Sequence, residues 1–186
     1  MLVGIDYGSK LAGTTVIASL GSDNVIQLIS SDKKQDADEM IRCEMDRLHP
    51  SLVGIDAPLS LPSVYQGKGE DYFYRQCDRQ LRAMSPMFLG GLTARAMKLN
   101  AQLEVPLIEV YPGALARAKS FEEFNYKQKT VAYEKILSSL DWACEYAALP
   151  ENGHQLDAIL ALYITWRFKN NQAEQVGDPD EGLIYY

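Results

Sequence analysis

The sequence contains few of the residues that build disulfide scaffolds, zinc sites and histidine-based active sites. Only three of its 186 residues are cysteines and only two are histidines. Cys43, Cys77 and Cys144 are far apart and have no metal-ligand spacing, so we expect no structural disulfide, as in a reduced, cytoplasmic setting. No Walker lysine loop and no grouping of serine, histidine and aspartate is present, which leaves covalent catalysis without a candidate.

Long hydrophobic runs and an excess of positive charge are also missing. No apolar stretch approaches the roughly 20 residues of a membrane span, and the N-terminus opens with a short apolar strand rather than a signal segment. We therefore expect a cytoplasmic protein without membrane contact. The net charge of −7 argues against a general nucleic-acid-coating protein. Residues 61–100 nevertheless contain six Lys or Arg against three acids, a net +3 that leaves −10 for the rest. This segment is either a solvated helix face or a basic patch that steers a phosphate-bearing ligand.

One tetrapeptide, Val-Gly-Ile-Asp, occurs twice, at residues 3–6 and 53–56. Each copy ends a short apolar run and is followed by a turn signal, which predicts two buried strands. If these strands are parallel neighbours, Asp6 and Asp56 emerge at the same carboxyl edge of the sheet, where open α/β sheets bind ligands. Two carboxylates there repel each other unless they share a proton or a cation. The repeat therefore predicts a divalent-metal site, although Asp6 alone is equally typical of a turn.

The order of the predicted elements indicates an α/β fold. Strands at 1–5, 12–20 and 25–30 form an antiparallel meander, and a helix at 36–48 returns the chain to a strand at 52–56. Hydrophobic patterns then predict a strand, three helices and a terminal strand, at 105–111, 113–119, 127–140, 155–170 and 182–186.

The ribonuclease H fold has this order: three strands, a helix, a strand and then further helices and strands. Actin-like ATPase domains share the same order. We expect residues 1–186 to form one such domain. Its mixed sheet is flanked by helices, and a helical insertion at about 60–103 follows the fourth strand.

Two further acids are candidates for the same site. Asp157 heads an apolar helical stripe that faces the core, so its carboxylate is expected to point inward, whereas a simple helix-dipole role needs no particular face. Glu109 ends another apolar strand and is either a metal ligand, a partner of one, or a cap for the next helix. His154, three residues before Asp157, is a less specific neighbour of this position.

Seven motifs stand in a fixed order along the chain: Gly4-Ile5-Asp6, Gly54-Ile55-Asp56-Ala57-Pro58-Leu59, Arg75-x-Cys77-Asp78-Arg79, Glu109-Val110-Tyr111-Pro112, Tyr126-Lys127, Asp157-Ala158 and Glu181-Gly182-Leu183-Ile184. Over nearly the whole chain they resemble the domain-of-unknown-function family 429, whose members are predicted ribonuclease-H-like nucleases. The resemblance implies a fold related to the Holliday-junction resolvases, with acidic metal ligands at Asp6, Asp56 and Asp157. Leu183 departs from the pattern, since an aromatic residue is more usual there.

These features favour a Mg²⁺- or Mn²⁺-dependent nuclease. Asp6, Asp56 and Asp157 would hold one or two ions, with Glu109 as a fourth catalytic acid. Basic residues would bind substrate phosphates: Arg75, Arg79 and Arg82, at i, i+4 and i+7 of a helix predicted at 71–84, and Lys127. Since most of the chain is acidic, we expect a structured or single-stranded nucleic acid as substrate rather than bulk duplex. Tyr65, Tyr72, Phe73 and Tyr74 either stack unpaired bases or pack the insertion.

Two other classes of function stay open at this stage. Residues 6–15 resemble the phosphate-wrapping hairpin of actin-like ATPases, which favours a nucleotide-binding module without nuclease activity. Those proteins usually need two such domains, however, and the chain is too short for both. The second alternative is an interaction domain whose acids have no catalytic role. The sequence does not distinguish DNA from RNA, one metal from two, or a monomer from an oligomer.

Overall fold

A mixed six-stranded sheet occupies the centre of the molecule. The computed structural model describes all of residues 1–186. The strand order is β5-β4-β1-β2-β3-β6. These strands are β1 Leu2–Asp6, β2 Val16–Leu20, β3 Val25–Ser30, β4 Leu52–Asp56, β5 Leu107–Glu109 and β6 Glu145–Tyr146. β1, β4 and β5 are parallel neighbours, and β2 runs antiparallel to both β1 and β3. The predicted meander and the return to a parallel fourth strand are confirmed.

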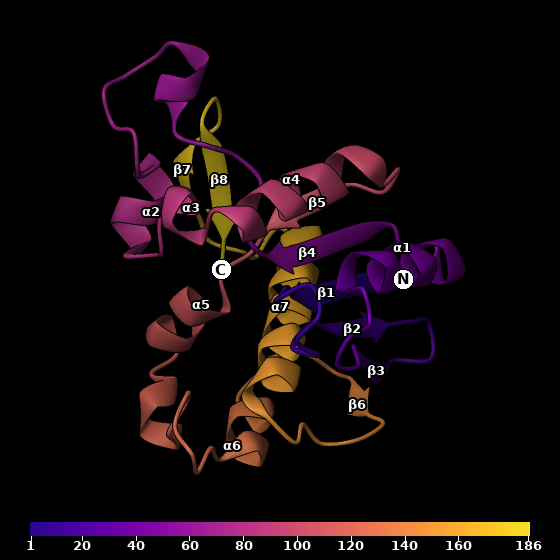
Figure 1. Ribbon diagram of the computed structural model, residues 1–186. Coiled ribbons are helices and arrows are strands. Elements are labelled where there is room, and N and C mark those ends of the chain that lie inside the picture. The colour runs from indigo at the N-terminus through magenta and orange to yellow at the C-terminus, as the bar shows by residue number, and fades with distance from the viewer.

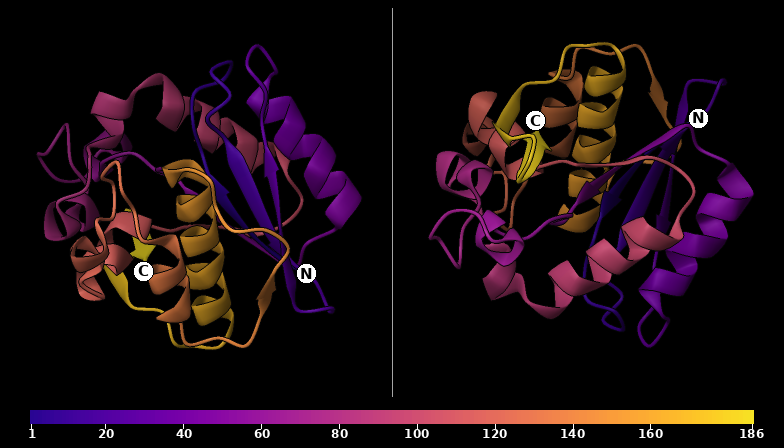
Figure 2. Two further views of the ribbon diagram at one scale, coloured as in Figure 1. Left: turned by 90° about the horizontal axis from the view of Figure 1, so that it is seen from below. Right: turned by 90° about the horizontal axis from the view of Figure 1, so that it is seen from above.

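Helices cover both faces of the sheet, which gives three layers (Figure 2). α1 (Ala37–Leu48) and α4 (Gly91–Gln102) pack on one face and share a core with β1 and β4. α7 (Gly153–Lys169) crosses the other face. α5 (Pro112–Ala118) and α6 (Tyr133–Ser138) contribute to the second core, on the α7 side. The α/β class is therefore confirmed. None of these helices combines the length and the apolar character that crossing a membrane requires.

The repeated Val-Gly-Ile-Asp sequence explains how α7 approaches the sheet so closely. Side chains alternate along a strand, so the valine and isoleucine of each copy enter the core shared with α1 and α4. The glycines face α7 instead. A Cβ at Gly4 would overlap the backbone of Leu162, and one at Gly54 would overlap the Thr165 hydroxyl. The same alternation places Asp6 and Asp56 on the α7 face, two residues beyond the glycines.

The insertion after β4 is helical, as expected. It contains η1 (Ser63–Gln66), α2 (Gln76–Leu81), α3 (Pro86–Leu89) and α4. The single helix predicted at 71–84 is wrong at both ends. Asp71 forms a turn by accepting hydrogen bonds from the amides of Phe73 and Tyr74, and α2 ends where Arg82 adopts a left-handed conformation at φ 50°. The three arginines therefore do not form one row along a helix.

The C-terminal half departs from the prediction in two further places. The helix predicted at 127–140 is reduced to α6, because an irregular segment follows the 3₁₀ helix η2 (Phe121–Phe124) and includes Lys127 at φ 62°. The predicted terminal strand exists as β8 (Gly182–Tyr185), but it pairs with the unpredicted β7 (Gln175–Asp178) in a separate hairpin. This hairpin lies beside α2 and the insertion (Figure 1).

Candidate functional site

Asp6 and Asp56 are direct neighbours at the carboxyl edge of the sheet. They are the last residues of β1 and β4, and their Cα atoms are register partners in the parallel pair. The prediction that both emerge at the same edge is confirmed. Neither side chain is free in water, since both residues are largely buried between the sheet and α7.

Asp157 reaches the same region from the first turns of α7. Its side chain is only 11% exposed. Burial, together with the negative charge of Asp157, raises the pKa of Asp6 to about 8. Burial and the charges of Asp157 and Asp6 likewise hold the pKa of Asp56 well above its usual range. The three carboxylates are thus close enough to disfavour each other's ionisation, as expected when like charges share a poorly solvated site.

Three side chains from the C-terminal half contact these acids. The Tyr126 hydroxyl donates to Asp157 Oδ1 at 2.6 Å, and Lys127 Nζ lies 3.5 Å from Asp157 Oδ2. Nδ1 of His154 lies 2.8 Å from Asp6 Oδ2. Burial opposes the charge of Lys127, but the carboxylates of Asp157 and Asp56 outweigh it and raise the pKa of the lysine. Lys127 therefore stays cationic beside the acids.

The roles of Tyr126 and His154 were not assigned from the sequence. The i, i+3 spacing of His154 and Asp157 would have placed both on one face of α7. Tyr126 had only its position next to Lys127 as a signal. Its contact with Asp157 depends on the irregular path of the chain after η2, which the helix predicted there concealed.

Arg75 is buried rather than available to substrate. Its side chain is 0% exposed, and it binds Glu109 through Nη1 at 2.7 Å and Nη2 at 2.6 Å. The same guanidinium donates to Asp78 Oδ1 at 2.7 Å and to Ser60 Oγ at 2.9 Å. With its donors engaged and no access from solvent, Arg75 cannot contact a phosphate, which corrects the substrate-binding role expected for it. Its ion pairs and hydrogen bonds connect the insertion to the end of β5.

Glu109 is placed beneath the site by the same network. Both of its oxygens accept hydrogen bonds from Arg75, and Oε2 also accepts one from the Leu59 amide at 2.9 Å. Glu109 is only 7% exposed. A carboxylate that already neutralises a buried guanidinium supports its neighbours and is not a free ligand.

Arg79 and Arg82 lie on the surface of the insertion, away from Arg75. Arg79 is 61% exposed, and its Nε donates to Asp71 Oδ2 at 2.7 Å. Its guanidinium also lies 4.7 Å from the centre of the Tyr74 ring. Arg82 is exposed at the end of α2. Of the four predicted basic residues, only Lys127 lies among the acids.

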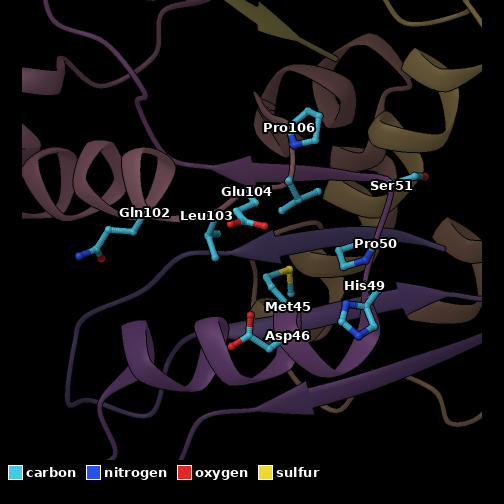
Figure 3. Close-up of a pocket in the computed structure, with 10 residues that line it drawn as sticks. Met45, Asp46, His49, Pro50, Ser51, Gln102, Leu103, Glu104 and Pro106 are labelled. Carbon is cyan, nitrogen blue, oxygen red and sulfur yellow. The ribbon is translucent and has the colours of Figure 1, made fainter.

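The acids open into a cleft of about 290 Å³. Its polar lining includes Asp6, Asp56, Asp78, Glu109 and Lys127, and its apolar lining includes Pro58, Met84, Leu89, Leu92 and Tyr111. A second cleft, of about 470 Å³, lies between the end of α1 and the segment after α4 (Figure 3). That cleft is at the opposite edge of the sheet and contains none of the predicted site residues. The chemistry is therefore concentrated in the first cleft.

The side chains of the first cleft suit a hard divalent cation. Mg²⁺ prefers oxygen ligands and is commonly held by one or two carboxylates together with waters. Asp6 and Asp56 supply two adjacent carboxylates, and the carboxylate of Asp56 has no hydrogen bond or ion pair within the chain. No group of three or more His, Cys, Asp or Glu side chains is arranged to hold a metal ion. The fit is therefore to a cation held by Asp6 and Asp56, and Asp157 would have to exchange its contacts with Tyr126 and Lys127 to join it.

Comparison with known proteins adds no assignment to this geometry. The function of the cleft must be inferred from its own side chains. No protein-family model matches the chain, and no curated protein matches it.

Proposed function

We propose that the chain is a divalent-metal-dependent nuclease with a ribonuclease-H-like fold, of the kind predicted for the domain-of-unknown-function family 429. The observation that carries the proposal is the adjacent placement of Asp6 and Asp56 at the ends of two parallel strands, with Asp157 facing them from α7. A three-stranded meander followed by a helical crossover to a strand beside β1 supports the proposed fold.

In this proposal, Mg²⁺ or Mn²⁺ is held by Asp6 and Asp56, and Asp157 completes the ligand set. When bound, the ion would act as a Lewis acid toward a phosphate oxygen of the substrate. Burial has already weakened the solvation of the two strand carboxylates, and it raises the pKa of Asp6 to about 8. A cation at this place would reduce the repulsion between the two carboxylates, and this gain in free energy favours cation binding.

The remaining polar residues supply positioning and charge. Lys127 stays cationic next to Asp157 and is placed to attract a substrate phosphate. His154 contacts Asp6 through Nδ1, and its side chain is 52% exposed, so Nε2 remains available to exchange a proton with solvent or a leaving oxygen. Tyr126 donates its hydroxyl to Asp157, a contact that Asp157 would exchange on joining the ligand set.

The test is cleavage of labelled single-stranded, hybrid, duplex and branched nucleic acids in Mg²⁺ or Mn²⁺, with chelator as the blank. Loss of a partner of a metal ligand typically costs about 10–100-fold in affinity or activity, so losing a ligand itself in Asp56→Asn should cost at least ~100-fold. Asp46→Asn is the matched control, because Asp46 is exposed on α1 and lines the opposite cleft. Cleavage that survives in the Asp6→Asn, Asp56→Asn double variant would exclude this function.

A further inference from the structure

The cleft beside the acids has a second half that metal-dependent hydrolysis does not explain. The cleft also has an apolar wall, formed by Pro58, Met84, Leu89, Leu92 and Tyr111. Met84, Leu89 and Leu92 come from the insertion and line the same cleft as Asp6 and Asp56, at the ends of β1 and β4. The cleft therefore combines carboxylates with apolar side chains, most of which come from the insertion.

The wall is partly accessible to solvent: Met84 is exposed, Leu89, Leu92 and Tyr111 are half-buried, and Pro58 is buried. Met84 is 61% exposed, so a ligand that covers its side chain would gain free energy from the apolar contact. A phosphodiester backbone and a hydrated cation gain nothing from such a surface. Contiguous apolar surface lining a cleft instead indicates that part of the ligand is apolar.

We propose that the apolar wall binds one unpaired nucleobase, so that the substrate is single-stranded nucleic acid or a nucleotide turned out of a duplex. This inference rests on the proposed function, because the acids of the same cleft would then face the phosphate of the same nucleotide. A base offers two apolar faces and is connected to a phosphate through the sugar, so one nucleotide can contact both the wall and the carboxylates. In a stacked duplex both faces of the base are covered and cannot reach the wall.

The size of the cleft and the charges around it agree with this ligand. Its volume of about 290 Å³ lies near the lower end of the ~300–1,000 Å³ that is usual for small-ligand pockets. One nucleoside suits that space better than a stacked segment. Lys127 lines the cleft, and the exposed Arg117 places its guanidinium 5.3 Å from the centre of the Tyr111 ring. An aromatic ring flanked by cations is the combination with which proteins hold unpaired bases and the phosphates attached to them. An apolar peptide would have no use for these cations.

The other aromatic side chains of the insertion are less suited to this role. Phe73 and Phe88 lie with ring centres 5.6 Å apart, and Tyr74 meets Phe88 at 5.9 Å. None of the three lines the cleft. They pack the insertion, and base binding falls to the side chains of the wall.

The experiment compares binding and cleavage of fluorescent oligonucleotides in single-stranded form, as a perfect duplex, and as a duplex with one unpaired nucleotide. Binding is measured by anisotropy in Ca²⁺ and cleavage in Mn²⁺. The wild-type protein should prefer the single strand and the unpaired nucleotide over the perfect duplex by about 10-fold or more, since each stacked base contributes strongly to binding. A single strand with an abasic position at the cleavage site should bind several-fold more weakly than the intact strand.

Met84→Ser tests the wall directly, and its melting temperature checks folding. It should weaken binding of the intact strand several-fold and leave binding of the abasic strand unchanged. Leu149→Ser is the control, because Leu149 is 48% exposed and lies outside the cleft; it should change neither.

The outcomes separate this inference from the proposed function. Equal cleavage of perfect duplex and single strand, with no effect of the abasic position, overturns the base site and leaves the nuclease standing. Base-dependent binding that Met84→Ser weakens, without any cleavage, supports the base site and removes the nuclease. If the protein neither binds nor cleaves the oligonucleotides, both the base site and the nuclease are overturned.

Discussion

Replacing Arg75 by methionine tests how the insertion is held against the sheet. Met has a similar length but no charge, so Arg75→Met leaves the carboxylates of Asp78 and Glu109 buried without their cation. The variant loses five hydrogen bonds of 3.1 Å or less, which the Arg75 side chain donates to Asp78, Glu109 and Ser60. The insertion and the end of β5 then have no ionic connection at this place.

The magnitude follows from burial. Arg75 is 0% exposed and its two acidic partners are 1% and 7% exposed. Removing one partner of so buried a pair typically costs about 3–5 kcal/mol, since an uncompensated charge is left behind. For a chain of this size, 1 kcal/mol corresponds to roughly 2–4 °C, so the melting temperature should fall by about 6–20 °C.

Thermal unfolding followed by circular dichroism or calorimetry measures this change. Arg79→Met is the matched control, because Arg79 belongs to the same insertion but pairs with Asp71 in solvent; it should shift the melting temperature by no more than about 2 °C. The loss in Arg75→Met should also shrink toward pH 5. Without the guanidinium, burial raises the pKa of Glu109 further, and a raised carboxyl pKa favours the folded state at low pH. Equal melting temperatures for the two variants would refute the assignment of Arg75 to a structural ion network.

Three further predictions concern the site and the sheet. In chelator, the free energy of unfolding should fall as the pH rises from about 4 to about 8, because the folded-state pKa of Asp6 is raised from 3.8 to about 8 and the folded state holds the extra proton. In thermal-shift measurements, Mn²⁺ should stabilise the protein more at pH 8 than at pH 5.5. A metal effect that does not depend on pH would contradict this prediction. His154→Ala, which removes the contact with Asp6, should weaken Mn²⁺ affinity by about 10-fold in calorimetric titration. An unchanged affinity would show that His154 does not support Asp6 as a metal ligand. Gly4→Ala should lower the free energy of unfolding in urea by more than about 3 kcal/mol, because the new methyl group overlaps the backbone of α7. Gly91→Ala, whose methyl group meets open space, should be close to neutral. Similar costs for both variants would refute the close packing of α7 on β1.

The repeated tetrapeptide made one half of the site predictable from sequence. Strand periodicity fixes which side chains share a face, and a short apolar run with a terminal acid places that acid at the strand end. The positions of Asp6 and Asp56 depend only on such local rules and on one helical crossover, whose handedness is nearly invariant. The inward face of α7 and the helix at 36–48, which starts at the capping residue Asp36, followed from the same kind of pattern.

The arginines show where local patterns are insufficient. Arg75, Arg79 and Arg82 have helical spacing, but Arg75 precedes α2 in an extended conformation, and Glu109 lies 34 residues away along the chain. A charged side chain is exposed by default, and only a distant acid that is buried beside it reverses that expectation. No local pattern carries this information.

The amino-acid sequence was therefore sufficient to predict the α/β layout and the acids at the ends of two apolar strands, because these follow from hydrophobic periodicities of two and 3.6 residues. Other contacts are visible only in the folded chain: Tyr126, Lys127 and His154 contact these acids, Arg75 is buried with Glu109, and Met84 and Leu89 line the same cleft as the carboxylates. These contacts join segments separated by irregular loops, whose paths are set by the packing of the whole molecule rather than by the residues within them.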